Sequence, residues 1–274
     1  ASAGVKSALL TCKVKTIQLL ARGAEIAIAA EAPQLEWAER YGQPANIYSR
    51  EINYWLWEVA IDILKHRPDI GLVYVHTTDY PMHTWAPEAP ESKEHLAELD
   101  RRLGKAMEAA PDAVFLITAD HGMNYKARCW DLFRACRDLG TEVRFALSAE
   151  KDRYVKHHRT FGGAAWVWLK SPRDESRVAQ TLIGLKGVEA VFPRHEAAAK
   201  FGLMPERIGE LVVLGDADTV FGELASPMEE LEPGYRSHGS LHESDIPLVI
   251  YNSRLELPPA GVFAANLDLT RHML

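Results

Sequence analysis

The chain has 274 residues, of which 47% are hydrophobic and 25% are charged, so it can bury one large core or a core plus a smaller inserted domain. The 31 Lys and Arg residues against 38 Asp and Glu give a net charge of −7, and no basic run is present, which argues against nucleic-acid binding. Three cysteines are too few for a disulfide framework. No apolar run approaches the ~20 residues of a membrane span and no signal peptide is visible, so we expect a cytoplasmic protein with neither nucleic-acid nor membrane partners.

The first 126 residues alternate between apolar runs and helical patterns. We expect strands at 5–11, 25–29, 70–76 and 113–118, and helices at 15–21, 50–65 and 92–109. The pattern is clearest over 50–65, where apolar residues recur at helical spacing: Ile52, Trp55, Leu56, Val59, Ile63 and Leu64. Strands that alternate with helices pair in parallel and carry helices on both faces. This half of the chain therefore predicts an α/β core with a mostly parallel sheet.

After residue 126 the predicted strands become shorter and more aromatic. We expect helices at 130–139 and 175–185, and strands at 142–147, 164–169, 188–192 and 210–214. This mixture is typical of a small α+β domain, and a final strand at 247–251 returns the chain to the core. We therefore assign residues 1–126 and 232–274 to the metal-binding α/β core and residues 127–231 to an inserted cap domain.

Two of the predicted core strands end in side chains that can bind metal ions. In open α/β sheets, ligands collect beyond the carboxyl ends of the strands. The third strand leads to Asp79 and His83, which share one face if the chain turns helical after the strand. The fourth strand leads directly to Asp120 and His121, which can serve one ion if the backbone bends sharply at Gly122.

A third element, His238, supplies another imidazole from a loop between Ser237 and Gly239. Each element also has a simpler explanation: Asp79 as a helix cap, Asp120 and His121 as part of a turn, and His238 as a solvated side chain. Three such elements in one chain, two of them at strand ends, are much less likely to arise by coincidence than any one of them alone. Carboxylate and imidazole ligands without cysteine suit a catalytic zinc site better than a closed structural one.

The strings TTDYPMH, TADHGMN and YRSHGSLHE, in this order, resemble the metal-binding segments of the alkaline phosphatase superfamily. Within it the chain most resembles the phosphonoacetate hydrolases and their nucleotide pyrophosphatase/phosphodiesterase relatives, over nearly its whole length. The resemblance implies an alkaline-phosphatase-like fold with an inserted cap and hydrolysis of a small anionic phosphonate or phosphate ester. Phosphonoacetate hydrolysis is the first expectation. A nucleotide pyrophosphatase/phosphodiesterase and a catalytically silent metal-binding domain are the alternatives.

The resemblance also implies two divalent metal ions, zinc by family, although manganese and iron accept the same donors. One ion would be held by Asp79, His83 and His238. The other would be held by Asp120 and His121.

The string Thr11-Cys12-Lys13-Val14-Lys15 resembles the family segment whose two lysines bind the substrate carboxylate. The alternative for Lys13 and Lys15 is a solvated helix start. His242, four residues after His238, is an alternative metal ligand. Two tryptophans of the cap, Trp166 and Trp168, could stack on a nucleotide base, although their alternating positions in a strand favour a place in the core.

One part of the family pattern has no counterpart in this chain. The family completes its second zinc site with an Asp on the first strand and uses a Thr nucleophile on a nearby helix, both upstream of the segment that begins here. No such elements precede Val5, so we identify no catalytic nucleophile and expect the amino-terminal part to be missing and the activity to be near background. Since that strand would lie inside the sheet, we also expect a partner chain or homo-oligomer, a rearranged sheet, or lowered stability.

Overall fold

The computed structural model describes residues 4–151 and 161–273, which divide into two compact units. The first unit contains residues 1–117 and 248–274, and the second contains residues 118–247. This partition differs from the one expected at residues 126 and 232, which stays a prediction about domains. Within the described ranges, no helix is both long and apolar enough to span a membrane.

The first unit is built on a parallel three-stranded sheet with the order β2-β1-β3. Its strands are β1 (Ser7–Thr11), β2 (Ile26–Ala29) and β3 (Leu72–His76). Because parallel strands carry their carboxyl ends to one edge of a sheet, the segments that follow β1 and β3 meet at that edge. The hydrogen bond from Cys12 N to His76 O, 3.2 Å long, joins the two strand ends there.

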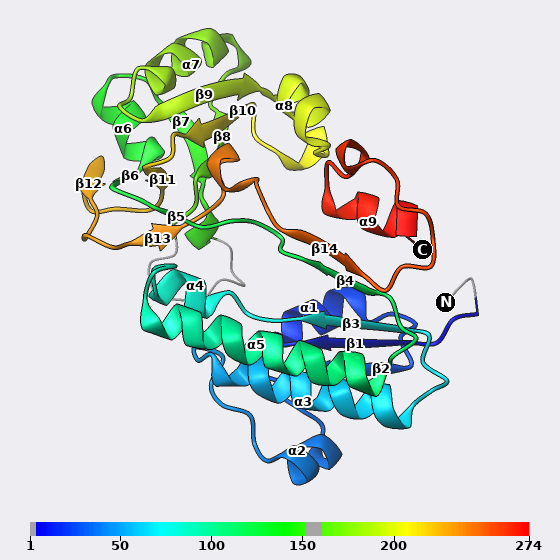
Figure 1. The fold of residues 1–274 in the computed structure, drawn as a ribbon. Helices are drawn as coiled ribbons and strands as arrows, with labels where there is room; N and C mark the ends of the chain where they lie inside the picture. The colour runs from blue at the N-terminus through cyan, green and yellow to red at the C-terminus, as the bar shows by residue number, and fades with distance from the viewer. Residues whose placement is uncertain (1–3, 152–160, 274) are drawn as a thin grey trace. The chain divides into compact units, whose positions relative to one another are not determined.

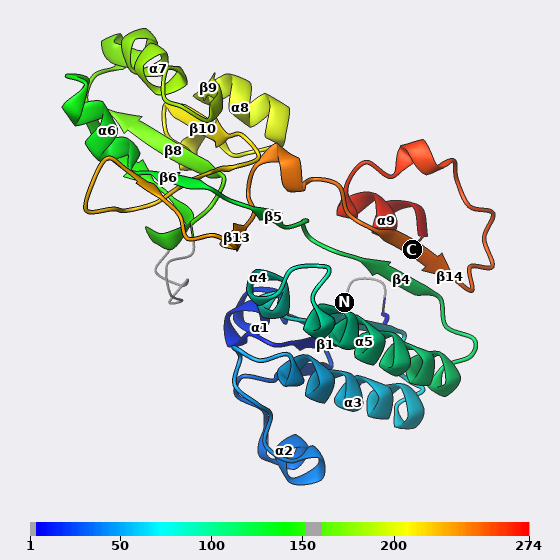
Figure 2. The same ribbon diagram turned by 60° about the vertical axis from the view of Figure 1, so that its left-hand side comes forward.

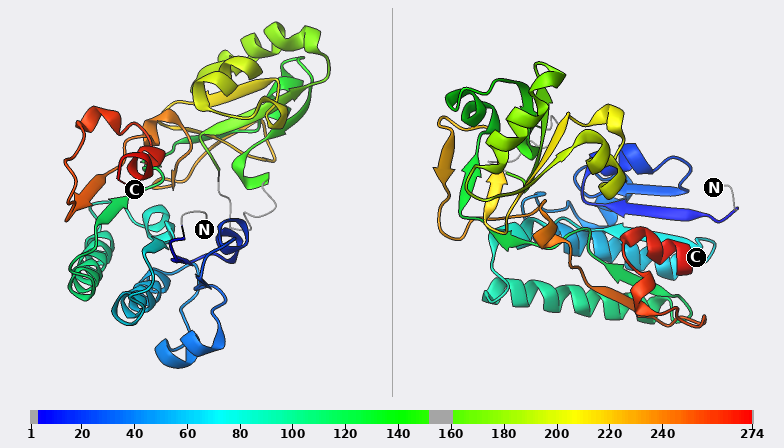
Figure 3. Two further views of the ribbon diagram at one scale, coloured as in Figure 1. Left: turned by 90° about the vertical axis from the view of Figure 1, so that its right-hand side faces the viewer. Right: turned by 90° about the horizontal axis from the view of Figure 1, so that it is seen from above.

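Helices cover both faces of this sheet (Figures 1 and 3). The helices of the first unit are α1 (Val14–Leu20), α2 (Leu35–Tyr41), α3 (Glu51–His66), α4 (Tyr80–Thr84), α5 (Pro90–Ala109) and α9 (Asn266–Met273), and those that pack on the sheet are α1 and α3. The apolar stripe of α3, with Leu56 and Val59 fully buried, packs against Ala8 and Leu10 of β1. The helix α1 lies on the opposite face, and α5 packs beside α3. This arrangement confirms the α/β class that the sequence predicts.

The core strands do not form one continuous sheet. The strands β4 (Phe115–Thr118) and β14 (Leu248–Tyr251) pair with each other in a separate two-stranded sheet (Figure 2). Among the described residues, no strand pairs with the second edge of β3 or with that of β4. Leu72 and Tyr74 of β3 remain 42% and 46% exposed. In the described part of the first unit, β4 and β14 therefore belong to a different sheet from β1, β2 and β3.

The second unit is built on a four-stranded antiparallel sheet with the order β7-β8-β10-β9. Its strands are β7 (Val143–Leu147), β8 (Ala164–Leu169), β9 (Val188–Pro193) and β10 (Leu211–Gly215). The helices α6 (Leu132–Asp138) and α7 (Glu175–Ile183) cover one face, and α8 (Arg194–Phe201) covers the other. Trp166 packs with the α8 face, and Trp168 contacts Phe145 at 5.6 Å between ring centroids. Both tryptophans therefore belong to the packing of the sheet.

Short elements complete the second unit. The strand β6 (Arg128–Trp130) pairs with β11 (Thr219–Phe221) and β12 (Met228–Glu230), and β5 (Asn124–Tyr125) pairs with β13 (Arg236–Ser237). The 3-10 helices of the chain are η1 (Ala149–Lys151), η2 (Pro172–Asp174), η3 (Pro205–Arg207), η4 (Leu241–Glu243) and η5 (Ala260–Val262). The β5–β13 pair matters most for function, because it joins the segment after His121 to the segment before His238.

Candidate metal centre

In the first unit, Asp79 and His83 form a carboxylate–imidazole pair. The helix α4 begins immediately after Asp79, so the two side chains lie four residues apart on one face, as the sequence predicts. The distance from Asp79 Oδ2 to His83 Nε2 is 3.2 Å. Asp79 occupies the N-cap position, but its side chain accepts no capping hydrogen bond from α4. The explanation of Asp79 as a helix cap is therefore not supported, and its carboxylate faces an imidazole instead.

Asn53 fixes the backbone that leads into Asp79. This fully buried residue of α3 accepts a hydrogen bond at Oδ1 from Thr78 N at 2.8 Å and donates one from Nδ2 to Thr78 O at 3.1 Å. The thiol of Cys12 also donates to Asn53 Oδ1, at 3.1 Å. Burial raises the pKa of Cys12 to about 12, so this thiol keeps its proton at neutral pH. One amide thus joins the ends of β1 and β3.

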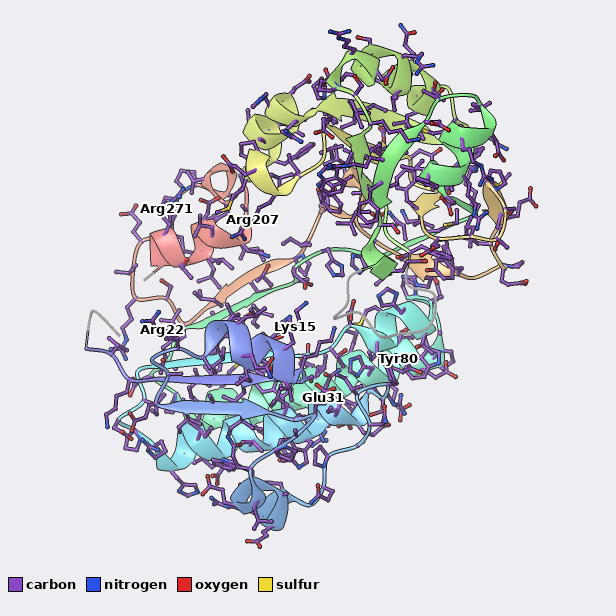
Figure 4. The ribbon with its side chains drawn as sticks, turned by 180° about the vertical axis from the view of Figure 1, so that it is seen from behind. Lys15, Arg22, Glu31, Tyr80, Arg207 and Arg271 are labelled. Carbon is purple, nitrogen blue, oxygen red and sulfur yellow. The ribbon has the colours of Figure 1, made fainter. Side chains whose placement is uncertain are left out.

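Lys13 and Lys15 stand at the same edge of the sheet. They follow β1, where Thr11 Oγ1 donates to Lys13 O at 2.8 Å and closes the turn into α1. Both lysines are half-buried. Figure 4 shows Lys15 on α1 and Tyr80 at the start of α4 at the same end of the sheet. Two cationic side chains therefore accompany the Asp79–His83 pair within the first unit.

In the second unit, the imidazoles of His121 and His238 lie face to face. Their ring centroids are 3.6 Å apart with an interplanar angle of 12°, and a ring nitrogen of each lies within 4.8 Å of the other. The antiparallel pairing of β5 with β13, which matches Ser237 to Asn124, brings the two segments together. Residues 117 positions apart in the chain (238 − 121) thus become neighbours.

The backbone sets which nitrogen of His121 can bind a metal. Its Nδ1 lies 2.9 Å from the carbonyl oxygen of Gly122, and because a carbonyl only accepts, Nδ1 carries the proton. Nε2 is then the nitrogen with a lone pair, an arrangement that is common for metal-binding histidines. Asp120 lies beside it, with Oδ1 at 3.6 Å from His121 Nε2, and 62% of the Asp120 side chain is exposed.

Glycines shape the backbone near these histidines. The chain bends at Asp120, where a bend is expected, and Gly122 follows with a φ outside the left-handed region. Its role is close approach, because a Cβ there would lie 3.3 Å from the carbonyl oxygen of Glu243. Gly239 supplies the unusual conformation instead, with φ 104°, directly after His238. A Cβ on Gly163 would lie 2.6 Å from Ser240 N, so this glycine also lets the His238 segment pack closely.

The alternative ligand His242 is engaged with a different partner. Its Nε2 lies 2.7 Å from Glu189 Oε2 on the surface of the second unit. Of the two histidines in this segment, only His238 therefore stacks on His121.

The donor chemistry of each unit suits a divalent transition metal. The first unit offers a carboxylate and an imidazole within 3.2 Å of each other, and the second offers a carboxylate beside two imidazoles. The three cysteines are buried and take no part in either group. Oxygen and imidazole donors of this kind fit zinc, manganese or iron in a catalytic site.

Known proteins share this fold. A phosphonoacetate hydrolase from Sinorhizobium meliloti 1021, solved with phosphonoformate, matches with a TM-score of 0.82 and 28% identity over 94% of this chain and 68% of that chain. Murine ectonucleotide pyrophosphatase/phosphodiesterase 5 matches with a TM-score of 0.56 and 16% identity, over 91% of this chain and 61% of its own. The human protein of the same name matches with a TM-score of 0.52 and 12% identity, over 86% of this chain and 61% of its own. The two mammalian matches show a common fold.

The sequence profile of a single family spans most of the chain. The profile of the Type I phosphodiesterase / nucleotide pyrophosphatase family matches residues 4–240. The family and the structural neighbours are hydrolases of phosphate esters or phosphonates. The alkaline-phosphatase-like fold expected from the motifs is thereby confirmed. The chain belongs to the Type I phosphodiesterase / nucleotide pyrophosphatase family of the alkaline phosphatase superfamily.

Proposed function

We propose that the protein is a metal-dependent phosphonoacetate hydrolase. The reaction consumes one water: the bond between phosphorus and carbon breaks, the carbon takes a proton to give acetate, and the phosphorus takes the oxygen to give phosphate. The similarity to the Sinorhizobium phosphonoacetate hydrolase, at 28% identity over 94% of the chain, carries this proposal. The two lysines beside Asp79 support it, because phosphonoacetate differs from a simple phosphonate by its carboxylate.

The ligands fall into two sets. Asp79, His83 and His238 would hold one divalent ion, and Asp120 and His121 would hold the other. The Asp79–His83 and Asp120–His121 pairs support the two sets, and His238 is placed in the first set by the resemblance to the family. Bound divalent cations, of which zinc fits these donors best, supply positive charge. This charge activates a hydroxyl group and stabilises the negative charge that develops on phosphoryl oxygens.

Lys13 and Lys15 would select the substrate. When the phosphorus–carbon bond breaks, the electron pair stays on carbon and is delocalised into the neighbouring carboxylate. Ammonium groups next to that carboxylate stabilise both the bound substrate and the charge that grows during bond cleavage. The half-buried positions of both lysines strengthen such contacts relative to fully solvated charges.

Calorimetric titration of the zinc-loaded protein tests this assignment. Phosphonoacetate should bind at least about tenfold more tightly than methylphosphonate, which lacks the carboxylate, in line with one or two charge-assisted contacts. The Lys13→Ala/Lys15→Ala double variant should lose that preference and keep its affinity for methylphosphonate. Lys65→Ala/Lys105→Ala, which removes two exposed lysines of α3 and α5, is the charge-matched control. Equal affinities for the two ligands in the unmodified protein would contradict the proposal, and so would release of acetate and phosphate in unequal amounts.

A nucleotide pyrophosphatase/phosphodiesterase is the second candidate. The family profile favours it, and one solved structure of the murine relative holds AMP. This candidate predicts that the protein hydrolyses a nitrophenyl nucleotide ester and that the Lys13→Ala/Lys15→Ala change leaves the rate of hydrolysis unaltered. The sheet packing of Trp166 and Trp168 gives this candidate no support from those residues. A silent metal-binding domain, the third candidate, would retain zinc and hydrolyse neither substrate.

A further inference from the structure

Among the described residues of the second unit, Lys126 and Glu243 form a buried ion pair, and each lies five residues along the chain from one of the two stacked histidines. The side chains of Lys126 and Glu243 are 0% and 1% exposed, and Lys126 Nζ lies 2.7 Å from Glu243 Oε1. Burying two charges costs several kcal/mol per ion, so such a pair adds little stability on balance. A pair in this position therefore points to a role besides stability.

The three oxygens of Glu243 together accept hydrogen bonds from two separate segments of the chain. Oε1 accepts hydrogen bonds from Lys126 Nζ and from Asn124 Nδ2, at 2.7 and 2.9 Å. Oε2 accepts from Ser240 N and Oγ, at 2.9 and 2.8 Å. The main-chain carbonyl of Glu243 accepts from Gly122 N at 2.7 Å. We call these five residues the Glu243 network.

The Glu243 network joins the segments that carry the two imidazoles. Gly122 follows His121 directly, and Asn124 and Lys126 lie within five residues of it. Ser240 is two residues after His238. A capping box on η4 accounts only for the contacts between Ser240 and Glu243. The contacts to residues 122–126 reach across more than 115 positions in sequence and have no such local explanation.

The electrostatics agree with a Glu243 that stays ionised. Burial alone would raise the pKa of its carboxyl group, but hydrogen bonds from Lys126, Ser240 and Asn124 outweigh this, so the pKa lies below the ordinary value. A charged acceptor holds its donors more strongly than a neutral one.

We infer that Glu243 is a positioning residue that fixes the spacing of His121 and His238 and thereby sets the affinity of the site for a divalent cation. This inference rests on the proposed metal-dependent function. Replacing a residue that orients metal ligands without itself binding the metal typically changes metal affinity 10–100-fold. The Glu243 network touches neither imidazole in the contacts described above and acts through the two backbone segments.

The test compares Glu243→Gln with a matched control in the same unit. Glu210→Gln is that control, because Glu210 also forms an ion pair, with Arg194 at 2.7 Å, and also accepts a main-chain hydrogen bond, from Leu169 N. Zinc affinity is measured by competition with a chromophoric chelator at a temperature at which both variants are folded. We expect Glu243→Gln to weaken zinc binding about 10–100-fold and Glu210→Gln to change it less than about twofold.

Further variants separate positioning from stability. Glu243→Gln leaves the Lys126 charge unpaired, whereas the double variant Lys126→Met/Glu243→Gln removes that charge. The double variant should recover melting temperature relative to Glu243→Gln without recovering zinc affinity. Ser240→Ala removes the hydroxyl that donates to Glu243 Oε2 and accepts from His242 N but keeps the Lys126–Glu243 ion pair. This milder change should weaken zinc binding about threefold, as expected for roughly 0.6 kcal/mol. Zinc affinity that simply follows melting temperature across the series would overturn the inference.

A measurement without metal distinguishes this inference from the proposed function. In the metal-free protein, ring-current shifts of the His121 and His238 protons in NMR spectra report the stacked imidazoles. These shifts should collapse in Glu243→Gln and persist in Glu210→Gln. If the unmodified protein binds no zinc, the proposed function fails, while loss of the shifts still supports positioning. Unchanged shifts in a folded Glu243→Gln variant would refute positioning.

Discussion

Replacing Asn53 by alanine should destabilise the first unit strongly. The change leaves Thr78 N–H and Thr78 C=O, at 6% residue exposure, without their side-chain partner. Each buried polar group that loses its partner costs about 1–3 kcal/mol, so the two together cost about 2–6 kcal/mol, and the thiol of Cys12 adds little. Because Asp79 follows Thr78 directly, the same change should also loosen the Asp79–His83 pair.

Urea unfolding followed by tryptophan fluorescence measures this loss, since Trp55 is buried on the same helix as Asn53. Asn46→Ala is the control, because Asn46 is exposed and its Oδ1 accepts a local hydrogen bond from Tyr48 N. Its free energy of unfolding should change by no more than about 0.5 kcal/mol. The reasoning fails if Asn53→Ala is as stable as Asn46→Ala.

Two further predictions concern the second unit. Gly163→Ala places a Cβ 2.6 Å from Ser240 N and 2.8 Å from Ser240 Cβ, so it should cost about 1–3 kcal/mol and lower the melting temperature. Gly184→Ala, whose Cβ would meet nothing closer than 3.4 Å, should leave the melting temperature equal or higher, and equal melting of both variants would contradict the packing argument. Burial alone would raise the pKa of Glu210, but hydrogen bonding from Leu169 and the charge of Arg194 outweigh it, so the folded-state pKa lies below the ordinary value. The stabilisation is therefore complete above the unfolded pKa of about 4.3 and is lost as the pH falls through the lower folded value. Between roughly pH 6 and pH 3, the melting temperature of Glu210→Gln should therefore fall less steeply than that of the unmodified protein. An equally steep fall in both proteins would contradict this prediction.

Long elements with a clear apolar period could be predicted from the sequence. The helix α3 appears where the pattern places it, because its buried face produces the apolar period. The strand β3 lies within its predicted range because its run of β-branched and aromatic residues favours a strand, although Leu72 and Tyr74 are exposed. The helix α8 was missed because it buries a single residue, Ala197, and so has no apolar stripe. The two-residue strands β5 and β13 are too short to show any alternation, although they bring His121 and His238 together.

Much of the candidate site could also be predicted, because its ligands follow strand ends in recognisable strings. The pairing of Asp79 with His83 follows from helical spacing alone. Asn53 and Glu243 could not be predicted, since their partners lie 25 and 117 residues away along the chain and a single polar residue carries no periodic signal. The close approach of Gly122 to Glu243 could not be predicted either, because this neighbour is fixed by tertiary structure.

The central claim is that carboxylates and imidazoles from three distant segments bind divalent cations. Zinc content after dialysis, measured by inductively coupled plasma mass spectrometry, tests it most directly. We predict two zinc ions per chain, a loss of bound zinc in the Asp79→Ala/His238→Ala variant, and no loss in His195→Ala, which removes an exposed histidine of α8. Zinc content that is the same in all three proteins would contradict the claim, as would an unmodified protein that retains no metal.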